Sequence, residues 1–313
     1  MNLRQLTYFV YIARTGSFNA AANTLHVAQS ALSRHMRELE EELGGPLLER
    51  GQRGVSLSDA GKVLFDRAQF ILSQVEEARV EVLAHNKELF GTVRLMMPSS
   101  IGPILVQPLV NRFLGKFPKV HLDYSEGLWD DAVNRLQTGS VDVAVMSGTK
   151  TSDYIEFQAL AHEQMVFVGR VGDPLVERNS IPIDAIVGLP LMMPAAALAS
   201  FQRTAPHIAE KLQVNLFVES APAMRSLTES GHGYAVVPNS VLLGNLEGRK
   251  IKGVLIEGLE VLRMVGTLKG RPKSRGTREL IAAIQAEFNN FIDAGLMRAP
   301  SLPIEEALRL ESV

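Results

Sequence analysis

The sequence predicts an α/β protein built of a helical N-terminal domain, one long helix and two α/β lobes. Three observations carry this prediction. Apolar residues recur at helical spacing in three short segments before residue 44, and a small hairpin follows them. A heptad pattern then runs through residues 59–90. From residue 91 onward strands alternate with helices, which is typical of mainly parallel sheets, and this part is long enough to form two lobes.

The composition limits the classes of protein to which the chain can belong. Its 313 residues are 46% hydrophobic and 21% charged, and the lack of cysteine excludes disulfides and thiolate metal sites and fits a reducing compartment. No basic segment followed by an apolar core opens the chain, and no apolar run reaches about 18 residues, so we expect a cytoplasmic protein without a membrane span. The net charge of −2 gives no support for nucleic-acid binding, so any such role depends on where the charges lie.

The first segments predict a helix-turn-helix. Apolar residues between Leu3 and Ala13 mark a helix that Gly16 ends, and Ser17 is a suitable N-cap for a short helix over Phe18–Leu25. After a short break, a third helix covers Val27–Gly44. Two helices joined by a tight turn, the second with a polar outward face, are the elements of this motif.

The third helix has two chemically different faces. The apolar face repeats at three and four residues and should meet a core; it consists of Leu32, Met36, Leu39 and Leu43. Basic residues lie early in this helix and acidic residues late, opposite to the preference of the helix dipole, and this order suits a helix whose N-terminal half enters the major groove of DNA. A solvated surface helix is the alternative. The polar face that would reach base edges and phosphates consists of Gln29, Ser30, Ser33, Arg34 and Arg37.

A hairpin and a long helix follow. Short strands over residues 47–50 and 55–57 flank a Gly51–Gly54 turn and would form a wing. Arg50 and Arg53 lie on this wing, where they would touch phosphates or a minor groove, although ordinary solvated turn residues are the alternative. Ser58 then caps a helix of about 30 residues with Asp59 in its first turn.

The long helix carries a narrow apolar seam of the coiled-coil form. A second copy of the chain is the simplest partner for such a seam, and packing on the chain's own downstream domain is the alternative. The positions of the seam are Leu64, Ala68, Ile71, Val75, Ala78 and Val82.

The remaining chain is predicted as alternating strands and helices. Expected strands cover Val93–Met97, Val120–Tyr124, Val141–Met146, Gln164–Gly169, Val214–Val218, Tyr234–Val237, Lys250–Ile256 and Val261–Leu268. Expected helices cover Pro103–Phe117, Asp130–Gln137, Ala199–Leu212, Pro222–Ser230 and Thr277–Ala294, and a loose amphipathic helix is expected after Pro300.

The α/β part lacks the marks of an enzyme. The sequence contains no phosphate-binding loop, no dinucleotide-binding glycine motif and no nucleophile elbow, and its seven histidines show no ligand spacing. Asp142 beside a strand core is a lone carboxylate and weak support for acid/base chemistry. We therefore expect no catalytic residue, no metal and no cofactor.

A ligand site is expected where strands end, because ligands of open α/β sheets bind beyond the carboxyl ends of the strands. Ser99 and Ser100 follow the first such strand and precede a helix, so they would hold an anion such as a carboxylate, although helix capping is the alternative. Other strand ends place Trp129, Met146, residues 193–194 and Met224 at the rim, with plain core packing as the alternative for each apolar residue.

Taken together, these residues resemble the LysR-type transcriptional regulators over essentially the whole chain. The specific motifs are L-x-x-F at Leu6–Phe9, GSFNAAANTLHVAQSALSRHMRELEEELGGPLLER at residues 16–50 and GVSLSDAG at residues 54–61. Looser matches are GSVDVAV at residues 139–145 and G-x-G-Y-A-V-V-P at residues 231–238. The N-terminal region is most similar to the nitrogen-assimilation-control subgroup. Two positions depart from the family pattern: Ser30 stands where Pro is frequent, which leaves base preference open there, and Leu48 stands where Phe is frequent.

The resemblance implies a winged helix-turn-helix over residues 1–58, a linker helix that pairs two chains over 59–90 and a two-lobed effector domain like periplasmic binding proteins over 91–300. Lobe I would comprise residues 91–161 and 267–300, lobe II residues 162–266, and a tail would cover 301–313. The implied function is sequence-specific transcription regulation controlled by a small molecule bound between the lobes. A metabolite-binding module without gene regulation is the alternative, and an enzyme that uses the cleft is a third possibility.

The resemblance also implies partners and site residues. The partners would be double-stranded DNA with an imperfect palindrome, a small-molecule effector, further copies in a dimer and a tetramer, and RNA polymerase. Gln29, Ser30, Ser33 and Arg34 would meet the major groove, and Arg50 and Arg53 the DNA backbone. The effector cleft would include Ser99, Ser100, Trp129, Met146, Pro194 and Phe201, with Met224 added from the rim.

Overall fold

A computed structural model describes residues 1–51, 54–83, 89–148, 151–243 and 250–300. The chain forms two compact units, and their boundary along the sequence follows Lys87. The tail after Pro300, with its expected loose helix, lies outside the described residues. In the described part of the chain, no helix is both long enough and apolar enough to cross a bilayer.

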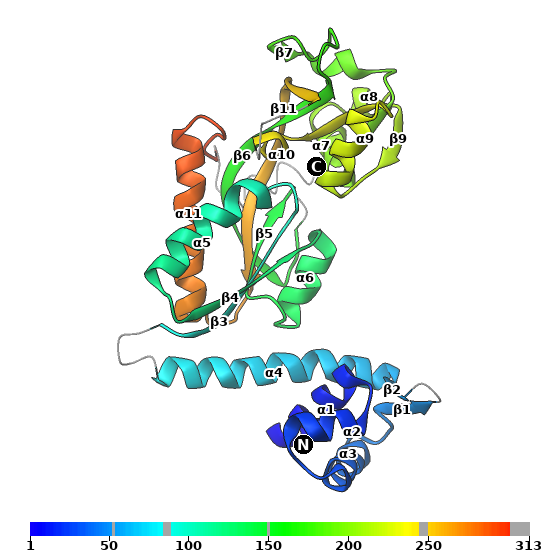
Figure 1. Ribbon diagram of the computed structural model, residues 1–313, viewed down its shortest axis with the longest axis vertical. Coiled ribbons are helices and arrows are strands. Elements are labelled where there is room, and N and C mark those ends of the chain that lie inside the picture. Colours follow the sequence, from blue (N-terminus) through cyan, green and yellow to red (C-terminus); the bar gives the residue numbers. More distant parts are fainter. Residues whose placement is uncertain (52–53, 84–88, 149–150, 244–249, 301–313) are drawn as a thin grey trace. The chain divides into compact units, whose positions relative to one another are not determined.

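The first unit has the predicted order of elements. It contains helices α1 (Leu3–Thr15), α2 (Phe18–Leu25), α3 (Gln29–Leu43) and α4 (Asp59–Leu83) and the hairpin strands β1 (Leu48–Gly51) and β2 (Gly54–Leu57) (Figure 1). The expected caps are present, because Ser17 Oγ accepts from the Ala20 amide at 3.3 Å and Ser58 Oγ accepts from the Gly61 amide at 3.0 Å. These local signals set the helix boundaries.

One hydrophobic core holds this unit together. Leu32, Met36 and Leu39 of α3 are buried in it, as the periodicity predicts. Leu43 is an exception, because it lies in the last turn of α3 and is 46% exposed. The other buried members are Leu6, Phe9, Val10, Ile12, Ala21, Ala22, Leu47 and Ala68.

The seam of α4 divides into two halves. Ala68 is completely buried in the core of the first unit, and Leu64 and Ile71 pack against that core. The second half is open, since Val75 is 43% exposed, Val82 is 76% exposed and Ala78 is also exposed. The expectation that Ala68 contacts a second chain is therefore wrong, because the helix-turn-helix already covers it.

The second unit combines a mixed sheet with helices on both faces. Its strands are β3 (Gly91–Met97), β4 (Val120–Glu126), β5 (Val143–Ser147), β6 (Ile155–Arg170), β7 (Ser180–Ile181), β8 (Leu191–Met193), β9 (Val214–Phe217), β10 (Tyr234–Pro238) and β11 (Ile251–Leu268). Its helices are α5 (Gly102–Lys116), α6 (Trp129–Gln137), the 3₁₀ helix η2 (Ile183–Ile186), α7 (Ala195–Thr204), α8 (Pro206–Ala209), α9 (Ala221–Glu229), α10 (Ser240–Leu243) and α11 (Arg275–Asp293).

Two long antiparallel strands, β6 and β11, run through both lobes (Figure 1). The strand order is β4-β3-β5-β11-β6-β10-β8-β9, with β7 beside β11. The strands on each side of this pair are parallel among themselves, so the expectation of mainly parallel sheets holds within each lobe and fails at the centre. The sequence prediction also divided β11 into two strands and missed the first half of β6, because polar residues interrupt both apolar patterns.

A proline explains another difference. The helix expected over Ala199–Leu212 is two helices, α7 and α8, which meet at Ala205 and Pro206. Proline lacks an amide hydrogen and disfavours helical backbone in the residue before it, and Ala205 accordingly has φ −148° and ψ 69°. The polypeptide therefore turns between the two helices.

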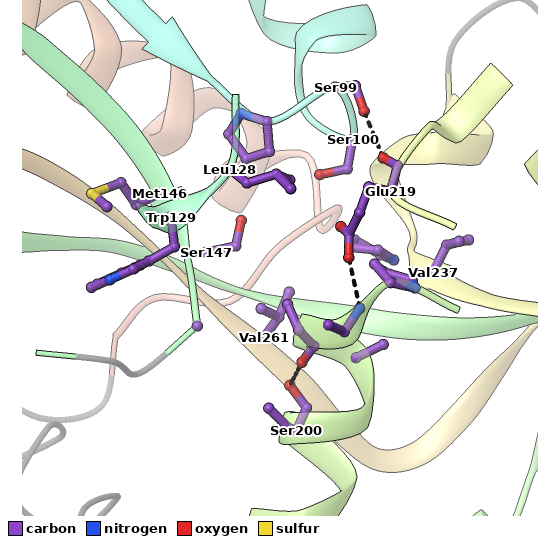
Figure 2. Close-up of a pocket in the computed structure, with 18 of the residues that line it drawn as sticks. Ser99, Ser100, Leu128, Trp129, Met146, Ser147, Ser200, Glu219, Val237 and Val261 are labelled. Atoms are coloured by element: carbon purple, nitrogen blue, oxygen red, sulfur yellow. Dashed lines mark hydrogen bonds between the residues drawn. The ribbon is translucent and has the colours of Figure 1, made fainter. Parts of the chain in front are cut away.

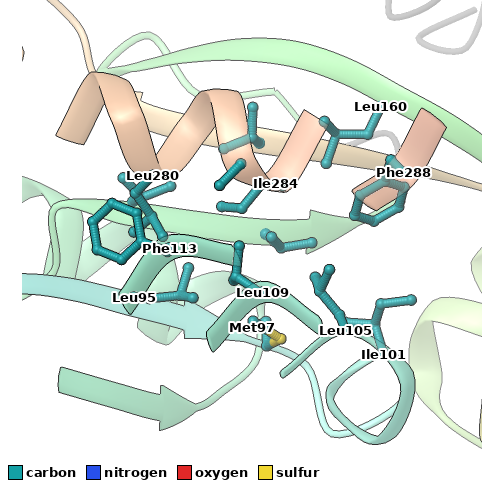
Figure 3. Packing of buried hydrophobic residues seen from close by; sticks show 14 of the residues in the cluster. Leu95, Met97, Ile101, Leu105, Leu109, Phe113, Leu160, Leu280, Ile284 and Phe288 are labelled. Atoms are coloured by element: carbon teal, nitrogen blue, oxygen red, sulfur yellow. The ribbon is translucent and has the colours of Figure 1, made fainter. Parts of the chain in front are cut away.

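Each lobe has a separate core. In lobe I, α5 and α11 pack together over the sheet through Leu105, Leu109, Leu280 and Ile284 (Figure 3). Core membership locates the crossings between lobes: Ala161 and Val265 belong to the lobe I core, whereas residues 165 and 261 belong to the lobe II core. The chain thus returns from lobe II to lobe I before residue 265, earlier than the expected 266–267. The sequence pattern could not locate this point, because the alternation of side chains along a strand does not indicate the lobe to which a residue belongs.

Candidate nucleic-acid interface and ligand cleft

The outward face of α3 carries the predicted polar residues. Gln29, Ser30, Arg34 and Arg37 are exposed and Ser33 is half-buried. The side-chain amide nitrogen of Gln29, Nε2, donates a hydrogen bond to Ser33 Oγ at 2.8 Å. Arg34 pairs with Glu38 one turn later, at 3.6 Å, and 69% of the Arg34 side chain is exposed. The opposite face is buried in the core, so the fold holds this row of donors in a fixed position on the surface.

The first turn of α3 is suited to an anion. Its N-cap residue, Ala28, supplies no side-chain hydrogen bond, and the turn contains no acidic residue. The amide hydrogens at a helix N-terminus have no partner within the helix and carry the positive end of the helix dipole. His26, in the left-handed conformation with φ 54°, makes the tight turn that brings α3 directly after α2. The backbone amides at the start of α3 can therefore donate hydrogen bonds to a phosphate.

The hairpin is fixed to the helical core by its backbone. Strands β1 and β2 pair antiparallel, with residue 50 opposite Val55, and the Val55 amide donates to the Gly16 carbonyl at 2.9 Å. Gly54 has φ +114°, and a Cβ there would lie 2.7 Å from the Gly16 oxygen, so only glycine fits. Of the two wing arginines, the backbone of Arg50 lies in β1; its side chain and all of Arg53 lie outside the described residues.

A cavity of about 290 Å³ lies between the two lobes of the second unit. Six of the seven predicted effector residues line it. Four of them, Ser99, Ser100, Trp129 and Met146, are seen in Figure 2. The other two are Pro194 and Met224. The prediction for Phe201 is wrong, because its side chain is completely buried in the lobe II core. Ser200 and Arg203, on other sides of the same helix, line the cavity instead.

Glu219 is a lining residue that sequence reasoning missed. It follows β9, so the strand-end rule would have found it if that strand had been included among the candidate rims. Its Oε1 accepts from the Ala195 amide at 2.9 Å, so its carboxylate occupies the start of α7. Its backbone carbonyl accepts from Ser99 Oγ at 3.3 Å, across the cleft from lobe I (Figure 2).

The rest of the wall is mainly apolar. Trp129, the only tryptophan, is half-buried and stacks on Phe157 with ring centroids 5.4 Å apart. Residues 146 and 224 contribute buried methionine side chains. Within the described ranges, no cluster of three or more His, Cys, Asp or Glu side chains is arranged to hold a metal ion.

An ion pair without solvent contact lies beside the floor of the cavity. Arg263 on β11 and Glu163 on β6 are both 0% exposed, and Arg263 Nε donates to Glu163 Oε2 at 2.7 Å. Arg263 also donates to the hydroxyl oxygens of Ser100 (3.2 Å), Ser147 and Ser240 (3.3 Å). Sequence analysis did not single out these two charged residues.

Comparisons with known proteins agree with this geometry. Residues 3–62 match the bacterial regulatory helix-turn-helix protein, lysR family, and residues 86–289 match the LysR substrate binding domain. The chain is 32% identical to the nitrogen assimilation regulatory protein nac of Escherichia coli (strain K12) over 251 residues, which are 77% of this chain and 79% of that protein. It is 28% identical to the uncharacterized HTH-type transcriptional regulator YybE of Bacillus subtilis (strain 168), over 87% of this chain and 94% of YybE.

Solved structures share the fold over most of the chain. Full-length OxyR from Pseudomonas aeruginosa superimposes with a TM-score of 0.72 at 23% identity, covering 91% of this chain and 95% of OxyR. CbnR, in a complex with its target DNA, superimposes with a TM-score of 0.69 at 22% identity, covering 91% of this chain and 99% of CbnR. The chain therefore belongs to the LysR family of DNA-binding transcriptional regulators, with an N-terminal helix-turn-helix and a C-terminal effector-binding domain.

Proposed function

We propose that α3 reads base edges in the major groove through Gln29, Ser30, Ser33, Arg34 and Arg37. The observation that carries this proposal is the exposed row of donors on a helix whose first turn has neither a side-chain cap nor an acid. Arginine and glutamine are the side chains that bind guanine and adenine edges with two hydrogen bonds, and free amide hydrogens bind phosphate. The acidic residues in the second half of α3 then lie away from the DNA.

The wing supplies contacts that do not depend on base sequence. In this proposal Arg50 and Arg53 meet phosphates beside the groove that α3 enters. Replacing Arg53 by alanine should weaken binding to specific and random duplexes alike and reduce the salt slope by about one. An unchanged salt slope would contradict the phosphate contact.

Two chains pair through the open half of the α4 seam. Val75, Ala78 and Val82 are exposed along one stripe of the helix, and an exposed apolar stripe of this kind is stabilised by a second helix. Paired chains place two α3 helices on one duplex, so the target would be an imperfect palindrome. We extend the proposal to a tetramer that contacts RNA polymerase, in keeping with family membership. Because its target is the chromosome, the protein would act in the cytoplasm.

The effector is a small organic molecule with an apolar body and an acceptor group, such as a carboxylate. The apolar walls around Trp129 suit the body. Ser100 Oγ and Ser147 Oγ both accept hydrogen bonds from Arg263, so their own hydrogens are left to donate toward the cavity. A carboxylate is the natural acceptor for two convergent hydroxyl donors. The cleft binds this molecule without turnover, so the chain is not an enzyme in this proposal.

Genome-wide capture of DNA by the purified full-length protein tests the proposal. Fragments are captured at physiological salt with and without pooled small-molecule metabolites. A shared, imperfectly palindromic site whose occupancy changes with metabolites is expected. Binding that is salt-labile and has no common site would remove the base-reading role of α3.

A further inference from the structure

The largest fully buried side chain among the described residues belongs to Arg263. It lies on β11 and its ion-pair partner Glu163 lies on β6, and these are the two strands that pass between the lobes. In the strand register Arg263 is opposite Ala161 and Glu163 is opposite Val261, so the two charged residues are diagonal neighbours on one face of the sheet. The ion pair therefore lies at the crossing between the lobes.

The guanidinium binds hydroxyl groups from both lobes. Ser100 follows β3 and Ser147 ends β5, so both belong to lobe I, whereas Ser240 begins α10 in lobe II. Ser240 closes the network: its amide donates to Glu163 Oε1 at 2.5 Å, and its hydroxyl donates to the Ser100 carbonyl at 2.8 Å. We call Arg263, Glu163, Ser100, Ser147 and Ser240 the crossing network.

The crossing network shares atoms with the cavity. Ser100 and Ser147 line the cavity, and so do Met165 and Val261, which lie two residues from Glu163 and Arg263 on the same strands. A ligand group that accepts hydrogen bonds from the Ser100 and Ser147 hydroxyls would thus contact the same side chains that Arg263 binds. Ser240 and Ser100 belong to different lobes, so their 2.8 Å hydrogen bond joins the lobes directly beside the cavity.

A second buried arginine provides a comparison. Arg271 donates to Asp142 Oδ1 at 3.2 Å, and only 9% of its side chain is exposed. Asp142 also accepts from the Arg94 amide at 2.9 Å, so these contacts lie within lobe I. The Arg271–Asp142 ion pair thus joins two residues of lobe I, whereas the hydrogen bonds of Arg263 reach both lobes.

We propose that Arg263, held by Glu163, is the positioning residue that couples the effector cleft to the arrangement of the two lobes. It orients Ser100 and Ser147 as donors toward the ligand and holds Ser240 of the other lobe with the same guanidinium. The inference rests on the proposed effector-binding role of the cleft.

Distances between spin labels on the two lobes test this inference in the full-length chain. The chain has no cysteine, so cysteines introduced at the exposed positions Asn111 (α5, lobe I) and Asn179 (before β7, lobe II) are the only labelling sites. Double electron–electron resonance is recorded after dilution with unlabelled chain, so that each measured pair lies within one chain. Variants Arg263→Met and Ser240→Ala are compared with Arg271→Met as the matched control.

The expected result is one narrow distance distribution for the parent and for Arg271→Met. For Arg263→Met and Ser240→Ala we expect a distribution that is broader or shifted by more than the parent's width. A parent-like distribution in both variants, with thermal melting curves that show folded protein, would overturn the inference. If Arg263→Met does not fold, Ser240→Ala decides alone, because it keeps the Arg263–Glu163 pair intact.

The outcome is separable from that of the proposed function. The distance measurement needs neither DNA nor effector, so an unchanged distribution would leave DNA reading by α3 standing. Conversely, failure to recover a common DNA site would leave the distance result valid.

Discussion

Replacing Arg34 by alanine separates base reading from folding, because its folded-state contacts are weak. Its described ion pair is to Glu38, at 3.6 Å between exposed side chains four residues apart in one helix. Such pairs contribute only about 0.3–0.5 kcal/mol to stability. A bidentate contact of arginine to guanine discriminates by roughly 1–3 kcal/mol, which corresponds to about a 5- to 150-fold loss of specific affinity at 1.4 kcal/mol per factor of ten. Specific binding should therefore fall strongly while the free energy of unfolding barely changes.

Fluorescence anisotropy with the captured site and with a random duplex of equal length measures both effects on DNA. Guanidinium denaturation followed by circular dichroism measures the free energy of unfolding. Arg79→Ala is the matched control, because Arg79 is 71% exposed and pairs with Glu76 at 3.9 Å within a helix, far along the chain from α3. The control should bind both duplexes like the parent.

The result that would refute the reasoning is an equal loss of affinity for specific and random DNA in Arg34→Ala. That outcome would mean that Arg34 contacts phosphate only. A loss of stability well above 0.5 kcal/mol in this variant would be equally damaging, since an exposed pair of this geometry accounts for about that much at most.

Three further variants test the dimer, the ionisation of a tyrosine and the wing. Replacing Val75 and Val82 by glutamate should give monomers in sedimentation at micromolar concentration with unchanged helical circular dichroism; a dimer that persists would reject the open seam. The Asp173 carboxylate accepts from the Tyr234 hydroxyl at 2.6 Å and, together with burial, raises the pKa of Tyr234 to about 12. The unfolded chain loses this proton near pH 10, so the stability that the tyrosine contributes should be lost as the pH rises from about 10 to 12, and Tyr234→Phe should flatten that part of the stability profile. Gly54→Ala places a Cβ 2.7 Å from a backbone oxygen and should lower the melting temperature of the N-terminal unit as well as affinity for any duplex; parent-like melting would show that the hairpin can shift freely.

The N-terminal unit could be predicted well because its signals are local. Ser17 and Ser58 cap helices within three residues of themselves, and Gly16 ends α1 in the left-handed conformation with φ 62°. The helix-turn-helix and the hairpin follow from residues that are neighbours in sequence. The prediction missed only what tertiary packing decides, such as the exposure of Leu43 at the end of α3.

The centre of the effector domain was harder to predict because its determinants are distant in sequence. Glu163 and Arg263 are separated by 100 positions, and each alone indicates an exposed strand residue or a loop. Only the pairing of β6 with β11 brings the opposite charges together and makes burial possible. Glu163 stands directly before the strand predicted over Gln164–Gly169, so it helped to hide the first half of β6. Arg263 lies within a predicted strand, and the polar residues that divided β11 in the prediction are Glu257 and Glu260.

The cleft could be located from sequence, but its polarity could not. The strand-end rule places Ser99, Ser100 and Met146 at the cavity because strand order alone determines that edge. Whether a serine donates to a ligand or is used within the protein depends on its partners. Ser99 donates to a carbonyl of the other lobe, while Ser100 accepts from a buried guanidinium. Two adjacent serines thus have opposite roles that no spacing rule distinguishes.

The α4 seam shows why periodicity predicts burial of a face and not the partner that buries it. One continuous heptad stripe contains Ala68, which is covered completely by the chain's own helices, and Val82, which is 76% exposed. The physical requirement is the same at both positions, because each apolar side chain is stabilised by removal from water. The difference is geometric. Helix α1 packs against α4, and Ala68 belongs to the resulting core. Among the described residues, Val75 and Val82 do not belong to that core. In the proposed dimer the stripe continues from an intramolecular core into a surface that a second chain covers, so charge at Val82 should affect assembly, whereas charge at Ala68 should affect folding.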